Sequence, residues 1–144
     1  MILGVGNDIV DIRRIEATLR RRGDLFRRRL FTDQEQTFAR TKINEAMALA
    51  RNYAVKEAVA KALGTGFSRG VAWRDIEIVR VKGAKPHIRL HGGALYHAWK
   101  LCPDTMKPDC DYSASDEPPY ATAVAILFAV STDSHQRADI PPTT

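Results

Sequence analysis

Apolar side chains recur at helical spacing between Asn52 and Gly66, and a glycine follows the last apolar pair, where a helix commonly ends. Asn44 is a suitable N-cap for the same element, so the pattern predicts one long, at least half-buried helix that runs to Leu63. Thr32 and the glutamate three residues later have the spacing of a capping box, which predicts a shorter helix through about Arg40.

The N-terminal pattern is that of a buried strand that ends near Asp8 or Ile9. Gly4 and Gly6 interrupt this strand, as at a bulge or at a close approach to another backbone segment. Helical spacing then resumes, which predicts a helix over 10–22 ended by Gly23, and a short second helix with its apolar residues between 25 and 31.

The second half of the chain is strand-rich. We expect a β-hairpin over 76–81 and 87–90 with its turn at 82–86, a helix over 92–101, and a loop over 102–109. A short strand at 112–115, a turn at 116–119 and a strongly apolar final strand at 120–130 follow. Residues 131–144 are polar with two prolines, and we expect them to form a loosely held tail outside a single domain over 1–130.

Composition sets the class of protein. A chain of 144 residues with 44% hydrophobic and 27% charged residues is typical of one ordinary globular domain. No stretch approaches the roughly 18 apolar residues of a membrane span, and the N-terminus lacks the basic region of a signal peptide. Cys102 and Cys110 lack metal-site spacing, so we expect a cytoplasmic protein with reduced thiols.

The net charge of +5 predicts an anionic partner, and much of it is concentrated in one segment. Eight arginines lie between positions 13 and 29, against the three acidic residues Asp11, Glu16 and Asp24. An ordinary solvated surface would mix both signs more evenly, so we interpret this segment as a docking surface rather than as a passive face.

Two acidic residues stand out because they interrupt apolar sequence. Asp8 follows the glycine-containing strand, and a carboxylate there is costly unless it is paired or binds a cation. It could instead be a turn or N-cap residue, although that would not explain the glycines. Glu57, Lys61 and Gly64 fall on one helix face, which could be a plain salt bridge or a ligand site ending in a glycine turn.

The two motifs together resemble the holo-acyl-carrier-protein synthases, the small 4′-phosphopantetheinyl transferases. They read GVGNDIVDIRRI from Gly4 and KEAVAKALGTG from Lys56, and the runs DIEIV, GAKP and SASDEPPYATAVAIL follow in the family's order. The resemblance extends from Met1 to about Val130. It implies an α+β fold in which an antiparallel sheet packs with a long central helix and shorter N-terminal helices.

The resemblance also implies a function. Such enzymes transfer 4′-phosphopantetheine from coenzyme A to a serine of an apo acyl carrier protein, depend on Mg²⁺, release adenosine 3′,5′-bisphosphate and support fatty acid biosynthesis. It implies Mg²⁺ ligation by Asp8 and Glu57, with Glu57 as the candidate base and Lys61 assisting the leaving group. It also implies a cytoplasmic homotrimer with its active site between subunits, where Asp8 and the segment 113–116 could face Glu57 of a neighbour.

Further residues match positions that bind the substrates in the family. Coenzyme A would be held on its phosphate side by Lys61, Gly64, Thr65 and Gly66, and near its nucleotide by Lys85 and Pro86. The acidic carrier protein would be contacted by Arg14, Arg21 and Phe26.

Two positions depart from the family pattern. Asn52 lies where relatives often have arginine, and the adjacent Arg51 points about 100° away on a helix, which puts one phosphate contact in doubt. Asp116 stands where some members have histidine, and we assign it no catalytic role.

Two other readings account for part of the sequence. A basic nucleic-acid-binding module would explain the arginines but neither Asp8, Glu57 nor the glycines, and the chain lacks a helix-turn-helix or stacking-aromatic pattern. A non-catalytic trimeric scaffold with the same fold is the third reading. We expect no nucleic-acid or membrane partner.

Overall fold

The structure is a computed structural model that describes residues 1–132; the predicted tail from residue 133 onward lies outside the described residues. Its elements are β1 (Ile2–Asp11), α1 (Ile12–Leu30), α2 (Asp33–Arg40), α3 (Glu45–Leu63), the short 3-10 helix η1 (Trp73–Asp75), β2 (Ile76–Val79), β3 (His87–Leu90), α4 (Gly92–Leu101), β4 (Met106–Glu117) and β5 (Tyr120–Ser131). Within residues 1–132, none of the helices has the length and hydropathy needed to cross a bilayer.

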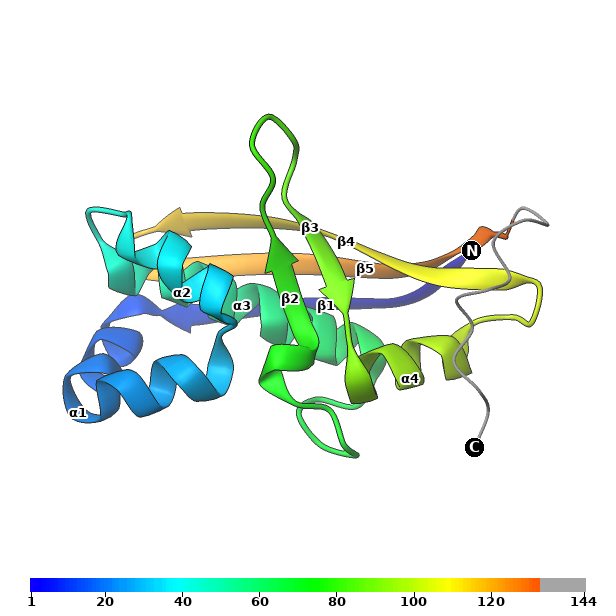
Figure 1. Ribbon diagram of the computed structural model, residues 1–144, viewed down its shortest axis with the longest axis horizontal. Coiled ribbons are helices and arrows are strands. Elements are labelled where there is room, and N and C mark those ends of the chain that lie inside the picture. The colour runs from blue at the N-terminus through cyan, green and yellow to red at the C-terminus, as the bar shows by residue number, and fades with distance from the viewer. Residues whose placement is uncertain (133–144) are drawn as a thin grey trace.

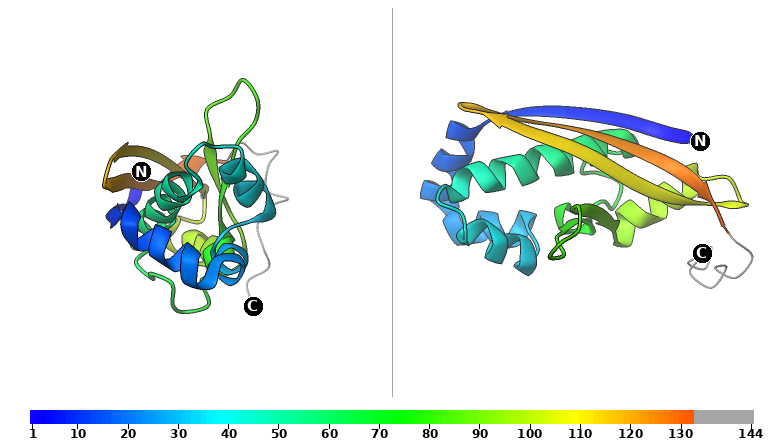
Figure 2. Two further views of the ribbon diagram at one scale, coloured as in Figure 1. Left: turned by 90° about the vertical axis from the view of Figure 1, so that its left-hand side faces the viewer. Right: turned by 90° about the horizontal axis from the view of Figure 1, so that it is seen from above.

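The main sheet has three antiparallel strands in the order β1-β5-β4, and the helices cover only one of its faces (Figures 1 and 2). The second, two-stranded sheet is the β2–β3 hairpin, whose loop projects beyond the edge of the main sheet (Figure 1). The predicted α+β fold with a long central helix is confirmed.

Small side chains let α3 lie directly on the sheet. Every second residue of β5 faces α3 and is buried, and four of these five are alanine: Ala121, Ala123, Ala125, Leu127 and Ala129. In β1, a Cβ atom added at Gly4 or Gly6 would overlap the carbonyl oxygen of Ala62 or Ala58, respectively. The predicted close backbone approach is therefore confirmed, and a register shift between Ile2 and Gly4 adds the bulge.

The predicted capping residues of α2 and α3 form the expected caps. Thr32 and Glu35 form the complete capping box of α2, Asn44 caps α3 by accepting from the Met47 N–H, and Gly64 ends α3 with a left-handed φ of 76°. Each of these three predictions is confirmed.

A buried ion pair joins α2 to α3. Lys56 Nζ lies 2.9 Å from Glu35 Oε2, and neither side chain has measurable exposure. The ammonium also donates to the carbonyl oxygens of Trp73 and Ile76, while the carboxylate accepts from the N–H groups of Thr32 and Ile78. The pair therefore has the hydrogen-bond partners that burial of charge requires, and it fixes α2, α3 and β2 relative to one another.

Three predicted boundaries were wrong. β1 continues to Asp11, because Val10 and Asp11 pair with β5, so the following helix begins at Ile12 rather than Val10. That helix continues to Leu30 across a kink at Arg22, instead of ending at Gly23. The second half of the predicted loop over 102–109 belongs to β4, which begins at Met106; an edge strand tolerates Pro108, and it leaves polar side chains in solvent.

Candidate active site

Asp8 and Lys61 meet where β1 crosses α3. Alternation along the strand puts Asp8 on the same side as Gly4 and Gly6, toward the helix. Lys61 Nζ lies 3.0 Å from Asp8 Oδ1 and donates to the carbonyl oxygen of Asn7 at 2.9 Å. The carboxylate is mostly enclosed, with 14% of the side chain exposed, whereas half of the lysine side chain is exposed. The glycines of β1 thus bring this carboxylate to the helix surface.

Glu57 lies one helical turn before Lys61 and belongs to the same cluster. Burial and the negative charge of Asp8 raise the pKa of the Glu57 carboxyl, while Lys61 and a hydrogen bond from the Tyr53 hydroxyl act in the opposite direction. Asp8 and Glu57 are therefore electrostatic neighbours within one chain. No neighbouring subunit is needed to bring these two carboxylates near each other, and whether Asp8 also faces a neighbour's Glu57 stays a prediction.

Tyr53 is a site residue that the sequence pattern did not reveal, because it was interpreted only as an apolar helix position. Burial and the charge of Glu57 raise the pKa of its hydroxyl. Its ring stacks on Trp73 at a centroid distance of 5.0 Å, and Trp73 stacks on Phe67 at 3.6 Å. The three rings connect Glu57 to the loop that follows α3.

The donor set of this cluster fits Mg²⁺. Two carboxylates face one ammonium, so the cluster has an excess of negative charge that a divalent cation would relieve. No group of three or more His, Cys, Asp or Glu side chains with metal-binding geometry occurs in residues 1–132. Mg²⁺ commonly takes one or two carboxylates and completes its octahedron with water and phosphate oxygens, which matches what Asp8 and Glu57 offer.

The loop after α3 begins three residues beyond Lys61, and the N–H groups of its first two glycines already have acceptors within the helix end. The N–H groups of Gly64 and Gly66 donate to the carbonyl oxygens of Lys61 and Ala60 at 3.0 and 3.1 Å, which closes the end of the helix. The Thr65 hydroxyl donates to the Gly66 carbonyl oxygen. A Cβ atom placed on either glycine would meet no atom within 4 Å, so the space beside the loop is open.

Lys85 and Pro86 lie in the loop between β2 and β3 and have different surroundings. The ammonium of Lys85 binds the Asp111 carboxylate at 2.8 and 2.9 Å, and this bond holds the pKa of Asp111 below its usual value. Pro86 lines a cavity of about 700 Å³, together with residues of α2, α3 and β4 that include Arg51, Tyr112 and Asp116. Of the two residues, only Pro86 lines this cavity.

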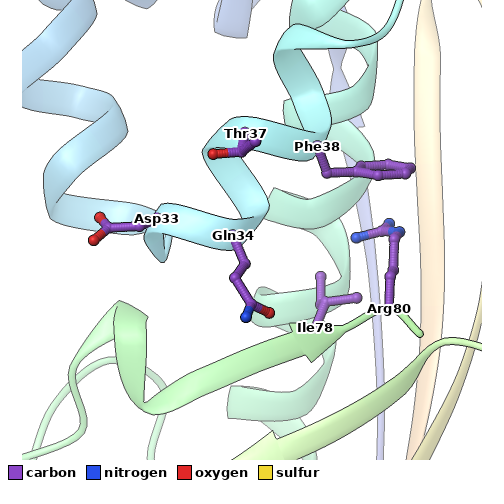
Figure 3. A pocket seen from close by; sticks show the side chains of 6 residues that line it. All are labelled: Asp33, Gln34, Thr37, Phe38, Ile78 and Arg80. Atoms are coloured by element: carbon purple, nitrogen blue, oxygen red, sulfur yellow. The ribbon is translucent and has the colours of Figure 1, made fainter. Parts of the chain in front are cut away.

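A second cavity, of about 420 Å³, lies between α2 and β2 (Figure 3). Phe38 and Arg80 line both cavities, with the guanidinium stacked under the Phe38 ring. Neither Asp8 nor Glu57 lines this second cavity. It is therefore separate from the carboxylate cluster.

Of the two departures from the family pattern, Asp116 lines the larger cavity, whereas Asn52 contacts Arg80, which lines it. Asn52 is buried, and its side-chain oxygen accepts from Arg80 Nη2 at 3.2 Å. Arg51 donates to the carbonyl oxygen of Ala114 and approaches Asp116 Oδ2 at 3.6 Å. Asp116 thus has a cationic partner in its own chain, and nothing in its contacts assigns it a chemical role.

The arginine-rich segment forms the exposed side of α1. Arg14 and Arg21 are exposed, while Phe26 is half-buried with its ring edge against Phe31. Among the described residues, six arginines of the segment form no ion pair: Arg14, Arg20, Arg21, Arg22, Arg28 and Arg29. The charge of Arg14 also acts on the Tyr53 hydroxyl. The positive face of α1 therefore begins next to the carboxylate cluster.

Known proteins resemble this chain over most of its length. The family model of the 4′-phosphopantetheinyl transferase superfamily matches residues 4–125. Holo-[acyl-carrier-protein] synthases of Phenylobacterium zucineum and Methylorubrum extorquens are each 45% identical over 130 residues, which is 90% of this chain and 94% and 96% of theirs.

Solved structures are similar over most of their length. The holo-[acyl-carrier-protein] synthase of Neisseria meningitidis has a TM-score of 0.75 at 30% identity, covering 89% of this chain and 99% of its own. The Helicobacter pylori synthase, solved in complex with coenzyme A, has a TM-score of 0.72 at 27% identity, covering 86% and 99%. The chain is therefore a transferase that belongs to the holo-acyl-carrier-protein synthase family of the 4′-phosphopantetheinyl transferase superfamily.

Proposed function

We propose that this enzyme transfers 4′-phosphopantetheine from coenzyme A to a serine hydroxyl of an apo acyl carrier protein, in a Mg²⁺-dependent reaction that supports fatty acid biosynthesis in the cytoplasm. The observation that carries the proposal is the convergence of Asp8, Glu57 and Lys61, which come from β1 and α3. Two carboxylates and an ammonium at one point suit a cation-assisted reaction on a pyrophosphate.

In the reaction, the serine oxygen attacks the phosphorus atom that carries pantetheine. The bond from this phosphorus to the bridging oxygen breaks, and adenosine 3′,5′-bisphosphate leaves. Mg²⁺, when bound by Asp8 and Glu57, supplies positive charge that stabilises the transferring and leaving phosphates. The protein's own task is positioning and charge stabilisation, as is usual for phosphoryl-type transfer.

Glu57 is the candidate base for the serine proton. Its pKa is raised by burial and by Asp8, which makes the carboxylate more basic than an exposed one. Lys61 holds Asp8 in place, and half of its side chain is exposed, so its ammonium can also approach the bridging oxygen and stabilise the leaving group. The open space beside Gly64, Thr65 and Gly66 would accept the phosphate side of coenzyme A.

The nucleotide end of coenzyme A would occupy the 700 Å³ cavity lined by Pro86. The carrier protein, which is small and acidic in this family, would approach the positive face of α1 at Arg14, Arg21 and Phe26. Opposite charge would accelerate this encounter and orient the serine toward Glu57.

We also include a homotrimer in the proposal. The face of the main sheet that carries no helix exposes apolar side chains from two adjacent strands: Val5 at 60%, Ile9 at 66%, Val124 at 40% and Ile126 at 40%. Such a stripe is expected to be covered by another protein surface. Sedimentation of the wild type as a trimer and of Ile126→Glu as a smaller species would support this; a monomeric wild type would exclude it.

Mass spectrometry tests the activity directly. Purified enzyme with Mg²⁺ and coenzyme A should convert an apo carrier protein to a species heavier by one phosphopantetheine. The absence of any mass shift with several carrier proteins would refute the proposed function.

A further inference from the structure

Two buried hydrogen-bond donors lie beside each other without acceptors. Asn52 is 1% exposed, and its amide nitrogen Nδ2 has no hydrogen-bond partner; Nη1 of the neighbouring Arg80 is likewise buried and unpartnered. Leaving such a donor unsatisfied costs about 1–3 kcal/mol, and more for a charged group. Two at one place indicate that an acceptor is missing from the free chain.

The arrangement holds the Arg80 guanidinium in one orientation. Arg80 follows the last residue of β2, its Nη2 donates to Asn52 Oδ1 at 3.2 Å, and its central carbon lies 4.0 Å from the centroid of the Phe38 ring. Figure 3 shows the guanidinium under this ring. Arg80, held in this way, also lines the larger cavity.

The charge around this cavity favours an anion. Its lining includes three cationic side chains, Lys42, Arg51 and Arg80, and one acidic side chain, Asp116. The acidic group is already paired with Arg51. Neither Lys42 nor Arg80 forms an ion pair among residues 1–132, although both lie over the Phe38 ring. A dianionic phosphate in this cavity would neutralise these charges and accept from the Arg80 guanidinium.

We propose that Arg80, oriented by Asn52 and Phe38, binds the 3′-phosphate of coenzyme A and sets the preference of this enzyme for the 3′-phosphorylated substrate. This inference rests on the proposed function. The pyrophosphate belongs at Asp8, Glu57 and Lys61, so the ribose 3′-phosphate is the remaining phosphate of the substrate. Asn52 lies five residues before Glu57 on α3, about 7.5 Å along the axis, a separation that a ribose can span.

Asn52 then acts by orienting Arg80, a role that its position on α3 alone did not suggest. An arginine at position 52 would project from α3, whereas here a guanidinium reaches the same place from the end of β2 and is held by the asparagine. Asn52 is accordingly a positioning residue, and Arg80 is the group that touches substrate.

Steady-state transfer with coenzyme A and with dephospho-coenzyme A, which lacks only the 3′-phosphate, tests the proposal. For Arg80→Gln, KM for coenzyme A should rise about 10- to 100-fold while KM for dephospho-coenzyme A stays within about twofold. Arg80→Lys keeps the charge without the fork and should lie between the two. Asn52→Asp keeps the side-chain shape but adds a negative charge, so it should also raise KM for coenzyme A selectively.

The comparison of the two substrates within each variant separates binding from folding, because a misfolded fraction affects both equally. Arg89→Gln, which removes an exposed arginine from β3, is the matched control and should leave both KM values unchanged. No rise in KM for Arg80→Gln, or an equal rise for both substrates, would overturn the proposal. Failure of the wild type to transfer at all would instead refute the proposed function, and binding of adenosine 3′,5′-bisphosphate by calorimetry would then test Arg80 on its own.

Discussion

Replacing Lys56 by methionine should weaken the fold strongly and leave the transfer chemistry of each folded molecule largely intact. Lys56 immediately precedes Glu57, yet the helix turns its side chain away from the carboxylate cluster, into the protein interior. Its ammonium has three acceptors, at 2.9 Å on Glu35, 2.7 Å on Ile76 and 3.1 Å on Trp73. Its role is therefore structural.

The size of the effect follows from burial. Methionine fills much of the same volume but leaves the Glu35 carboxylate buried without its cation, and it removes the donor that Lys56 supplies to the carbonyl oxygens of Trp73 and Ile76. Removing one partner of a buried ion pair costs about 3–5 kcal/mol. In a domain of this size, that loss corresponds to a decrease in Tm of roughly 10–20 °C. The double variant Glu35→Gln/Lys56→Met should lose less than the sum of the two single variants, because no unpaired charge remains.

Thermal and urea unfolding would measure the stabilities, and transfer rates at 15 °C, corrected for the folded fraction, would measure the chemistry. Lys61→Met is the matched control on the same helix. Its side chain is half exposed, so its stability should change by less than about 1 kcal/mol, whereas its transfer rate should fall sharply. A Lys56→Met variant that keeps its stability and loses activity would refute the assignment of a structural role.

Three further predictions concern the site and its approach. Burial and a neighbouring carboxylate raise the pKa of Glu57 in the folded state. Ionisation of Glu57 therefore lowers the stability of the folded protein at pH values above that pKa, and it has no effect below about pH 4, where the carboxyl is protonated in both states. Without metal, Glu57→Gln should therefore be at least as stable as the wild type at pH 8, with the difference shrinking toward pH 4 in thermal unfolding; a clear loss at pH 8 would contradict this. Gly6→Ala should lower the free energy of unfolding by about 2 kcal/mol or more and impair transfer, because the added Cβ atom pushes β1 away from α3. The control Gly23→Ala should be nearly neutral in urea unfolding, because its Cβ atom meets only a flexible side chain. The double charge reversal Arg14→Glu/Arg21→Glu should raise KM for the carrier protein about tenfold or more at low salt and leave KM for coenzyme A unchanged; equal increases in steady-state assays would remove α1 from the docking surface.

Much of the fold was predictable because local chemistry marks its boundaries. The capping box at Thr32, the N-cap Asn44 and the C-terminal Gly64 each act within a few residues, and all three occur as predicted. The N-terminal half of β4 was missed because an edge strand can carry proline and acidic side chains, which makes its sequence look like a loop. Whether a strand lies at an edge depends on the whole sheet and not on its own residues.

Some residues of the candidate site were likewise predictable from local sequence, and others were not. Asp8 and Glu57 were conspicuous because each interrupts apolar sequence, and the glycines before Asp8 indicated the close approach that brings the two together. Arg80 was interpreted only as part of the expected strand over 76–81. Its contact with Asn52 spans 28 residues, and its position under Phe38 depends on how α2 packs against β2, so no local pattern reveals it.

Calorimetric titration of Mg²⁺ in the presence of coenzyme A tests most directly whether Asp8 and Glu57 share one cation beside the pyrophosphate. The wild type should bind one Mg²⁺ per active site, and Asp8→Asn and Glu57→Gln should each weaken that binding about 10-fold or more while the proteins stay folded. If either variant binds Mg²⁺ as tightly as the wild type does, that carboxylate does not hold the ion, and the proposed mechanism is wrong.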